Sequence, residues 1–199
     1  MKIAIPKESR EHETRVAATP ETVKKFIKLG ADATVQAGAG DTASIPDADY
    51  ENAGAFVEKT FAATLKGADV VLKIQRPGTS EIKSFAKGQR LFCTMSPYGD
   101  RETLDALAAK GVDCFAMEFM PRITRAQSMD VLSSQANLAG YKAVLEAANA
   151  YGKGMPQMMT AAGTVAASIS WNVFGVDASQ KLMRLSLTVI RLTCAPPRA

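Results

Sequence analysis

Five polar side chains between residues 122 and 133 have the types and the spacing to bind a polar ligand. Arg122 and Arg125 lie in a loop that follows a predicted strand, and Gln127, Asp130 and Ser133 come next, three residues apart. Residues three apart lie along one edge of a helix, so we expect the amide, the carboxylate and the hydroxyl to form a row. A row of this kind beside a positive loop suits a ligand that carries a carboxamide and sugar hydroxyls.

The same segment also has a purely structural interpretation. Thr124 with Gln127 matches a capping box, and an acidic residue such as Asp130 is favourable in the first turn of a helix. The spacing alone leaves both interpretations open.

Unbroken apolar segments alternate with helical ones along the first 120 residues, and this alternation predicts the fold class. A capping hydroxyl at Thr19 followed by Pro20 predicts the start of a helix that ends at Gly30, and residues 101–110 predict another. Apolar strands separated by helices indicate an α/β fold, a parallel sheet with helices on both faces that is Rossmann-like. The predicted strands are residues 2–5, 33–36, 70–74, 91–94 and 114–117.

The 199 residues suffice for one complete domain and part of a second. We expect a first domain over residues 1–125 and one long connecting helix over residues 126–150. A glycine- and proline-containing break follows that helix. Residues 151–199 would then begin a nucleotide-binding domain, truncated and divergent after residue 165.

A glycine-rich segment at residues 37–40, Ala-Gly-Ala-Gly, invites a phosphate-loop interpretation. It lacks the Gly-Lys-Ser/Thr ending of a P-loop and the full Gly-x-Gly-x-x-Gly fingerprint of a dinucleotide site. We therefore predict an ordinary turn.

Composition and charge exclude several classes of function. Hydrophobic residues make up 47% of the chain and charged residues 22%, as in globular proteins. Of the formal charge of +4, residues 166–199 hold +3, because four cations there face Asp177 alone, and the rest of the chain holds +1. No basic stripe alternates with aromatic residues, so we expect no nucleic-acid partner.

Cysteine and histidine are too sparse for a metal site. Cys93, Cys114 and Cys194 are far apart, and His12 is the single histidine. We expect the cysteines to be small buried apolar residues in a reducing compartment. Charges come too early for a signal sequence, and no apolar run is long enough to span a bilayer, so we expect a cytoplasmic chain.

The run of residues 122–141, RITRAQSMDVLSSQANLAGY, resembles the signature of the alpha subunit of proton-translocating NAD(P) transhydrogenase, and the resemblance extends over residues 1–165. In that family the segment lies against the nicotinamide end of NAD(H). The resemblance places the cofactor contacts on Arg122, Gln127, Asp130 and Ser133, and we assign no catalytic residue. It also implies NAD as cofactor, a membrane-embedded partner subunit that binds NADP, dimerisation, and a place at the inner membrane through that partner.

Other features resemble the wider superfamily that includes alanine dehydrogenase. There, an arginine and a lysine hold the substrate carboxylate, and the matching residues here are Arg15 and Lys73. Without the resemblance, both would be interpreted as solvated or structurally paired cations. The histidine of alanine dehydrogenases is replaced by Ser96, which argues against amine chemistry and fits direct hydride transfer between two nicotinamide rings.

The resemblance fails after Val165. Gly175 is the last glycine of the chain, so the second and third glycines of a dinucleotide fingerprint are missing. Residues 193–196, Thr-Cys-Ala-Pro, are what the family's Asp-Val-Arg-Pro gives when read one base out of phase, which suggests a frameshift between about residues 165 and 179. A genuine short homologue with a divergent end is the competing explanation.

Three functions remain after these observations. The first is the NAD(H)-binding subunit of a transhydrogenase, of which this chain would be a fragment that is inactive alone. The second is a non-catalytic product unable to bind NAD. The third, disfavoured by Ser96, is an alanine dehydrogenase.

Overall fold

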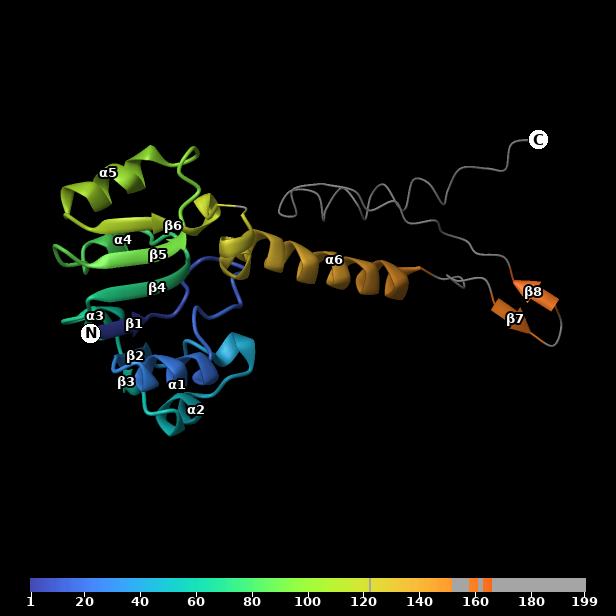
Figure 1. Ribbon diagram of the computed structural model, residues 1–199, viewed down its shortest axis with the longest axis horizontal. Helices are drawn as coiled ribbons and strands as arrows, with labels where there is room; N and C mark the ends of the chain where they lie inside the picture. The colour runs from blue at the N-terminus through green and yellow to red at the C-terminus, as the bar shows by residue number, and fades with distance from the viewer. Residues whose placement is uncertain (122, 152–157, 161–162, 166–199) are drawn as a thin grey trace. The chain divides into compact units, whose positions relative to one another are not determined.

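The computed structural model describes residues 1–121, 123–151, 158–160 and 163–165. The chain separates into two compact units, Met1–Asp130 and Val131–Ala199. The first unit is an α/β domain, in which six strands form one sheet in the order β3-β2-β1-β4-β5-β6 (Figure 1). The strands are β1 (Lys2–Ile5), β2 (Asp32–Gln36), β3 (Phe56–Glu58), β4 (Val70–Gln75), β5 (Arg90–Thr94) and β6 (Asp113–Ala116).

Every pairing in this sheet is parallel. The predicted fold class is therefore confirmed, as are the five predicted strands, within one or two residues at each end. The strand β3 was not predicted from the sequence, and none of its three residues is buried. The helices of the first unit are α1 (Pro20–Lys28), α2 (Asp47–Asn52), α3 (Phe61–Leu65), α4 (Thr79–Ile82) and α5 (Arg101–Ala109).

Helices cover both faces of the sheet because successive strand residues point to opposite sides. Ile3 and Ile5 of β1 pack with Val23 of α1 and Tyr50 of α2 in one buried cluster. Ala4 belongs to a second cluster, on the other face. In that cluster it is buried with residues of α3, α4 and α5, namely Leu65, Ile82 and Leu107.

The predicted start of α1 is confirmed in detail. The hydroxyl of Thr19 accepts a hydrogen bond from the backbone N–H of Thr22 at 3.3 Å, and Pro20 occupies the first helical position. Gly30, with a φ of +83°, follows the last turn. Leu29 is 84% exposed because it lies beyond the last helical residue.

The glycine segment at residues 37–40 is a turn, as predicted. The backbone N–H of Gly38 donates to both carboxylate oxygens of Asp47, at 2.9 and 3.1 Å, so this donor is already satisfied within the protein. A Cβ at Gly40 would collide with the carbonyl oxygen of Ile45, which explains the glycine by close packing.

The second unit contains α6 (Val131–Ala150) and an antiparallel hairpin of β7 (Met158–Thr160) and β8 (Gly163–Val165). The prediction of one helix over residues 126–150 is wrong at its start. Residues Thr124–Met129 form a separate 3-10 helix, η3, and Asp130 is extended with a ψ of 92° before α6 begins. No residue of α6 is buried.

Two smaller predictions have different outcomes. Cys93 is buried as expected, whereas Cys114 is exposed because it lies on β6, the edge strand of the sheet. Cys194 and the whole divergent tail of residues 166–199 lie outside the described residues. Within the part of the chain that is described, no helix combines the length and the apolarity that crossing a membrane requires.

Candidate functional site

The order of the strands places a switch point between β1 and β4. The chain runs outward from β1 through β2 to β3, then crosses to β4 and continues outward through β5 to β6. In open parallel sheets, ligands bind at the carboxyl ends of the strands beside such a reversal. The residues that follow β1 and the last residues of β4 therefore form the candidate ligand-binding edge of the sheet.

A buried ion cluster occupies this position. The ammonium of Lys73, near the end of β4, lies 3.3 Å from both carboxylate oxygens of Glu81 in α4. It also lies 3.7 Å from Oε2 of Glu8, which follows β1. The side chains of Lys73, Glu8 and Glu81 are 1%, 3% and 11% exposed. The cluster thus joins the two halves of the sheet and holds two carboxylates against one ammonium.

Backbone N–H groups complete the hydrogen bonding of both carboxylates. Glu8 accepts from the N–H groups of Ile74 and Gln75, at 2.6 and 3.4 Å, and Glu81 accepts from Gly78 at 2.8 Å. Burial nevertheless raises the pKa of Glu8, against the lowering effect of Lys73 and of these N–H groups. The ammonium of Lys73 also lies 5.5 Å from the centre of the Phe61 ring.

Arg15 lies in a second ion pair at the same edge of the sheet. Its guanidinium forms two hydrogen bonds with Glu13, at 2.7 and 2.6 Å, and Glu13 also accepts from the side-chain amide of Gln75 at 3.0 Å. The hydrogen bonds from Arg15 are the main reason that the pKa of Glu13 is lowered to about 2. Arg15 itself remains half-exposed.

Ser96 lies just beyond β5, at this same edge. It adopts a left-handed backbone conformation with a φ of 47°. The carboxylate of Glu118 accepts hydrogen bonds from the backbone N–H groups of Met95 and Ser96 and fixes the turn. Arg76 donates to the carbonyl oxygens of Met95 and Ser96, at 3.2 and 3.4 Å, and pairs with Asp100 at 3.1 Å.

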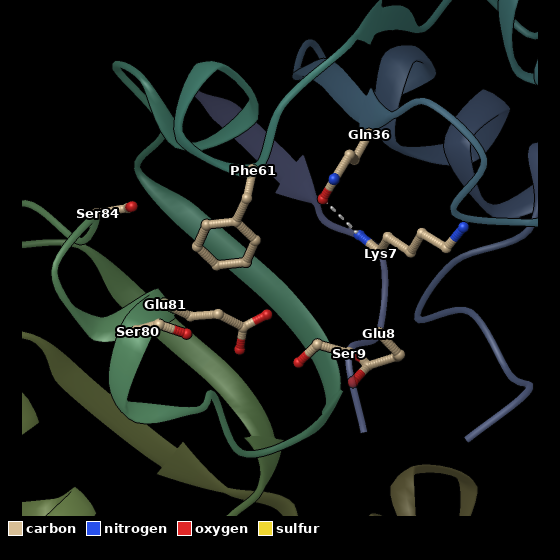
Figure 2. Close-up of a pocket in the computed structure, with 8 residues that line it drawn as sticks. All are labelled: Lys7, Glu8, Ser9, Gln36, Phe61, Ser80, Glu81 and Ser84. Atoms are coloured by element: carbon tan, nitrogen blue, oxygen red, sulfur yellow. Dashed lines mark hydrogen bonds between the residues drawn. The ribbon is translucent and has the colours of Figure 1, made fainter. Parts of the chain in front are cut away.

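A pocket of about 440 Å3 opens beside the ion cluster (Figure 2). Glu8 and Glu81 line it, together with Phe61 and the serines Ser9 and Ser80. Lys73 is not among the residues that line it. A ligand there would therefore meet carboxylates and hydroxyls before it met the buried ammonium. Lys7, Gln36 and Ser84 complete the lining.

The residues predicted to hold a nicotinamide are not all described by the structure. Arg122 lies outside the described residues. Gln127 is exposed on η3, Asp130 ends that helix, and Ser133 lies in the first turn of α6. The three residues do not lie along one helix edge, because the helix is interrupted at Asp130 and the unit boundary follows it.

One part of the structural alternative for the same segment, the capping box of Thr124 with Gln127, is wrong. Thr124 is inside η3, and Ile123 precedes the helix without a side-chain hydrogen bond to it, so no capping box forms. The cofactor contacts suggested by the resemblance stay a prediction.

Arg15 and Lys73 were singled out from the sequence, but the acids that pair with them were missed. Glu8 was assigned no role from the sequence. Glu81 carried one usable signal, since an acid three residues after Gly78 is typical of the start of a helix. Nothing in the sequence spacing indicates Glu13 as the partner of Gln75, because that pair is 62 residues apart.

With this geometry established, comparison with known proteins identifies the family. The model of the family described as "Alanine dehydrogenase/PNT, N-terminal domain" matches residues 4–139. This chain belongs to that family. Its first unit is therefore the domain that transhydrogenases and alanine dehydrogenases share at their amino ends.

Individual relatives refine the assignment within the alanine dehydrogenase/PNT family. The first of the chains that form the NAD(P) transhydrogenase subunit alpha of Rhodospirillum rubrum is 50% identical over 170 residues, which cover 83% of this chain and 44% of that protein. The crystal structure of the transhydrogenase from Sinorhizobium meliloti matches with a TM-score of 0.79 and 54% identity, over 84% of this chain and 50% of that one. An alanine dehydrogenase of Halomonas elongata is 32% identical over 209 residues, which cover all of this chain and 55% of that protein.

Two facts follow from these similarities. The identity is higher to the transhydrogenases than to the alanine dehydrogenase, so within the family the chain corresponds to the amino-terminal part of a transhydrogenase alpha subunit. The chain spans about half the length of these relatives.

Proposed function

We propose that this chain provides the amino-terminal part of the NAD(H)-binding subunit of a proton-translocating transhydrogenase. The observation that carries the proposal is the 50% identity to a transhydrogenase alpha subunit over 170 residues. The intact subunit would present NAD(H) for hydride exchange with NADP(H) on a membrane-embedded partner subunit. It would act as a homodimer in the cytoplasm, peripheral to the inner membrane through that partner.

The chemistry at the carboxyl edge of the sheet agrees with hydride transfer better than with amine chemistry. Interconversion of an amine and a ketone needs a proton donor and acceptor near neutral pH. The single histidine, His12, is almost fully exposed and pairs with Glu11. Ser96, in the slot of the alanine dehydrogenase histidine, cannot replace it. Transfer of a hydride between two nicotinamides requires alignment and exclusion of water, but no acid or base.

In this proposal Arg122, Gln127, Asp130 and Ser133 position the nicotinamide end of NAD(H), whose chemistry is supplied by the cofactor itself. Gln127 is exposed, so its side-chain amide is accessible to a polar ligand. Arg15 and Lys73 would have no part in hydride transfer, because each is engaged by a carboxylate of the chain.

A matched pair of variants tests the cofactor contacts. We would join residues 1–165 of this chain to the remaining segment of the Rhodospirillum rubrum relative, which gives a hybrid of that relative's length. Gln127→Ala should weaken NADH binding to this hybrid by about tenfold, the value of one or two lost polar contacts. Ser128→Ala, on the same exposed 3-10 helix, should leave binding unchanged. Equal affinities in the two variants would contradict the proposed contact.

A second candidate function is a non-catalytic product that cannot bind NAD. It is favoured by the missing glycines after Gly175, without which the backbone cannot approach a pyrophosphate closely. Titration of the unmodified chain with NADH, followed by fluorescence, separates the two. Micromolar binding would contradict this second candidate.

We also propose that a frameshift between about residues 165 and 179 produced the tail. Resequencing the gene from the codon for Gly163 tests it. A single-base correction that opens a frame encoding Gly-x-Gly-x-x-Gly would support the frameshift, and the absence of any such frame would contradict it.

A further inference from the structure

The pocket beside the ion cluster has a feature that the proposed function does not use. Figure 2 shows the carboxylate of Glu81 and the hydroxyls of Ser9 and Ser80 pointing into one common space, with the Phe61 ring forming a wall. The described part of the chain offers neither serine side chain a hydrogen-bond partner. The space thus presents several oxygen acceptors and one apolar surface.

The charges around this space do not balance. Glu8 and Glu81 face Lys73, whose ammonium lies behind them and does not line the pocket. The ammonium of Lys7 points away from the two carboxylates, as Figure 2 shows. Glu13, the next acid, is neutralised by Arg15. The lining of the pocket therefore carries one negative charge in excess. This charge is shared by two glutamate side chains that are almost entirely buried.

We infer that this pocket binds a small primary alkylammonium ion. Its three N–H donors match Glu81, Ser9 and Ser80, and its carbon chain would lie against Phe61. A bound cation would compensate the carboxylate charge that Lys73 alone leaves unbalanced. The inference is separate from nucleotide binding and involves none of the residues assigned to the nicotinamide.

The same geometry disfavours a carboxylate ligand at this position. Such a ligand would face the oxygens of Glu8 and Glu81, while the buried ammonium of Lys73 is already paired with them. The charge preference of the pocket is therefore opposite to that expected of the superfamily's anion site at Lys73.

Titration of the isotopically labelled full chain, observed in 1H–15N spectra, tests the inference. The probe is propylammonium chloride, with sodium chloride at equal ionic strength and sodium propionate as comparisons. We expect saturable shifts of the amides of Ile74, Gln75 and Gly78, which donate to the two carboxylates, with a dissociation constant on the order of millimolar. Equal shifts with sodium chloride, or tighter binding of propionate, would overturn it.

Three variants sharpen the result. Glu81→Gln keeps an acceptor for Gly78 but removes the charge, and should weaken propylammonium binding by about tenfold or more. Glu102→Gln, an exposed acid on α5, is the matched control and should change nothing. Should Glu81→Gln fail to fold, Phe61→Leu retains every charge and should reduce the preference for propylammonium over methylammonium. Unchanged binding in Glu81→Gln, or an unchanged preference in Phe61→Leu, would refute the site.

Discussion

Replacing Lys73 by methionine should be one of the most destabilising single changes in the first unit. The substitution keeps a long side chain but removes the ammonium that pairs with both Glu8 and Glu81. At 3.3 Å and an effective dielectric constant of about 20, the attraction to one carboxylate is about 5 kcal/mol. Removing one member of a buried ion pair costs about 3–5 kcal/mol, and we expect a loss in this range at pH 7.

The loss should shrink in acid. The pKa of Glu8 is already raised in the folded protein and would rise further without Lys73. A carboxyl whose folded pKa lies above its unfolded value makes the folded state less stable as the pH rises above that unfolded value, about 4.5. The variant should therefore recover stability relative to the unmodified chain as the pH falls from 7 towards 4.5. Urea unfolding followed by circular dichroism at several pH values measures both quantities.

A matched control separates burial from charge. Lys25→Met removes an ammonium that pairs with Glu21 at 3.2 Å on the exposed surface of α1, and it should cost no more than about 0.5 kcal/mol. Glu8→Gln and Glu81→Gln added to Lys73→Met should restore much of the loss, because no uncompensated charge remains. A loss below about 1 kcal/mol in Lys73→Met, or one independent of pH, would refute the reasoning.

Three further changes test other parts of the structure by urea unfolding. Glu13→Gln removes a carboxylate whose pKa is lowered to about 2. The variant's free energy of unfolding should be lower by about 1–2 kcal/mol at neutral pH, after allowance for solvent screening at half-exposed Arg15. That difference should vanish as the pH falls from about 4.5 towards 2, and a constant difference would contradict it. Gly40→Ala should cost about 1–3 kcal/mol through its collision with the Ile45 carbonyl, whereas Gly78→Ala, with nothing within 4 Å of its Cβ, should cost less than about 1. Similar losses in the two glycine variants would count against the packing argument. Tyr50→Phe should cost about 1 kcal/mol, because its buried hydroxyl donates to the carbonyl oxygen of Ala18 at 2.9 Å, and an unchanged unfolding midpoint would argue against that bond.

The sheet could be predicted from the sequence because most of its strands are apolar segments that are recognisable without knowledge of the rest of the fold. β1 and β4 read as apolar segments, and the capped start of α1 at Thr19 and Pro20 is a local feature. β3 escaped prediction because it is only three residues long, too short to show a pattern, and two of those residues are exposed. The interruption at Asp130 escaped too, because a break between a 3-10 helix and an α-helix needs neither glycine nor proline.

The ion cluster is the part of the site that the sequence could not specify. Lys73 and Glu8 are 65 residues apart, and only the crossover from β3 to β4 brings them together. A lysine in an apolar strand indicates a buried cation that needs an acidic partner, but several acids of the chain could have been that partner. The superfamily resemblance matches Lys73 to a residue that holds a substrate carboxylate, and that role stays a prediction. In the structure, two carboxylates of the chain itself lie beside Lys73.

The measurement that tests the central proposal most directly compares two reactions of the hybrid subunit described above. One is hydride transfer from NADH to NADP in membrane vesicles that contain the remaining transhydrogenase subunits. The other is oxidation of NADH that depends on pyruvate and ammonia. We predict the first reaction and not the second for the hybrid, and neither for the unmodified chain. Pyruvate- and ammonia-dependent oxidation by the hybrid, with no transfer to NADP, would contradict the proposal.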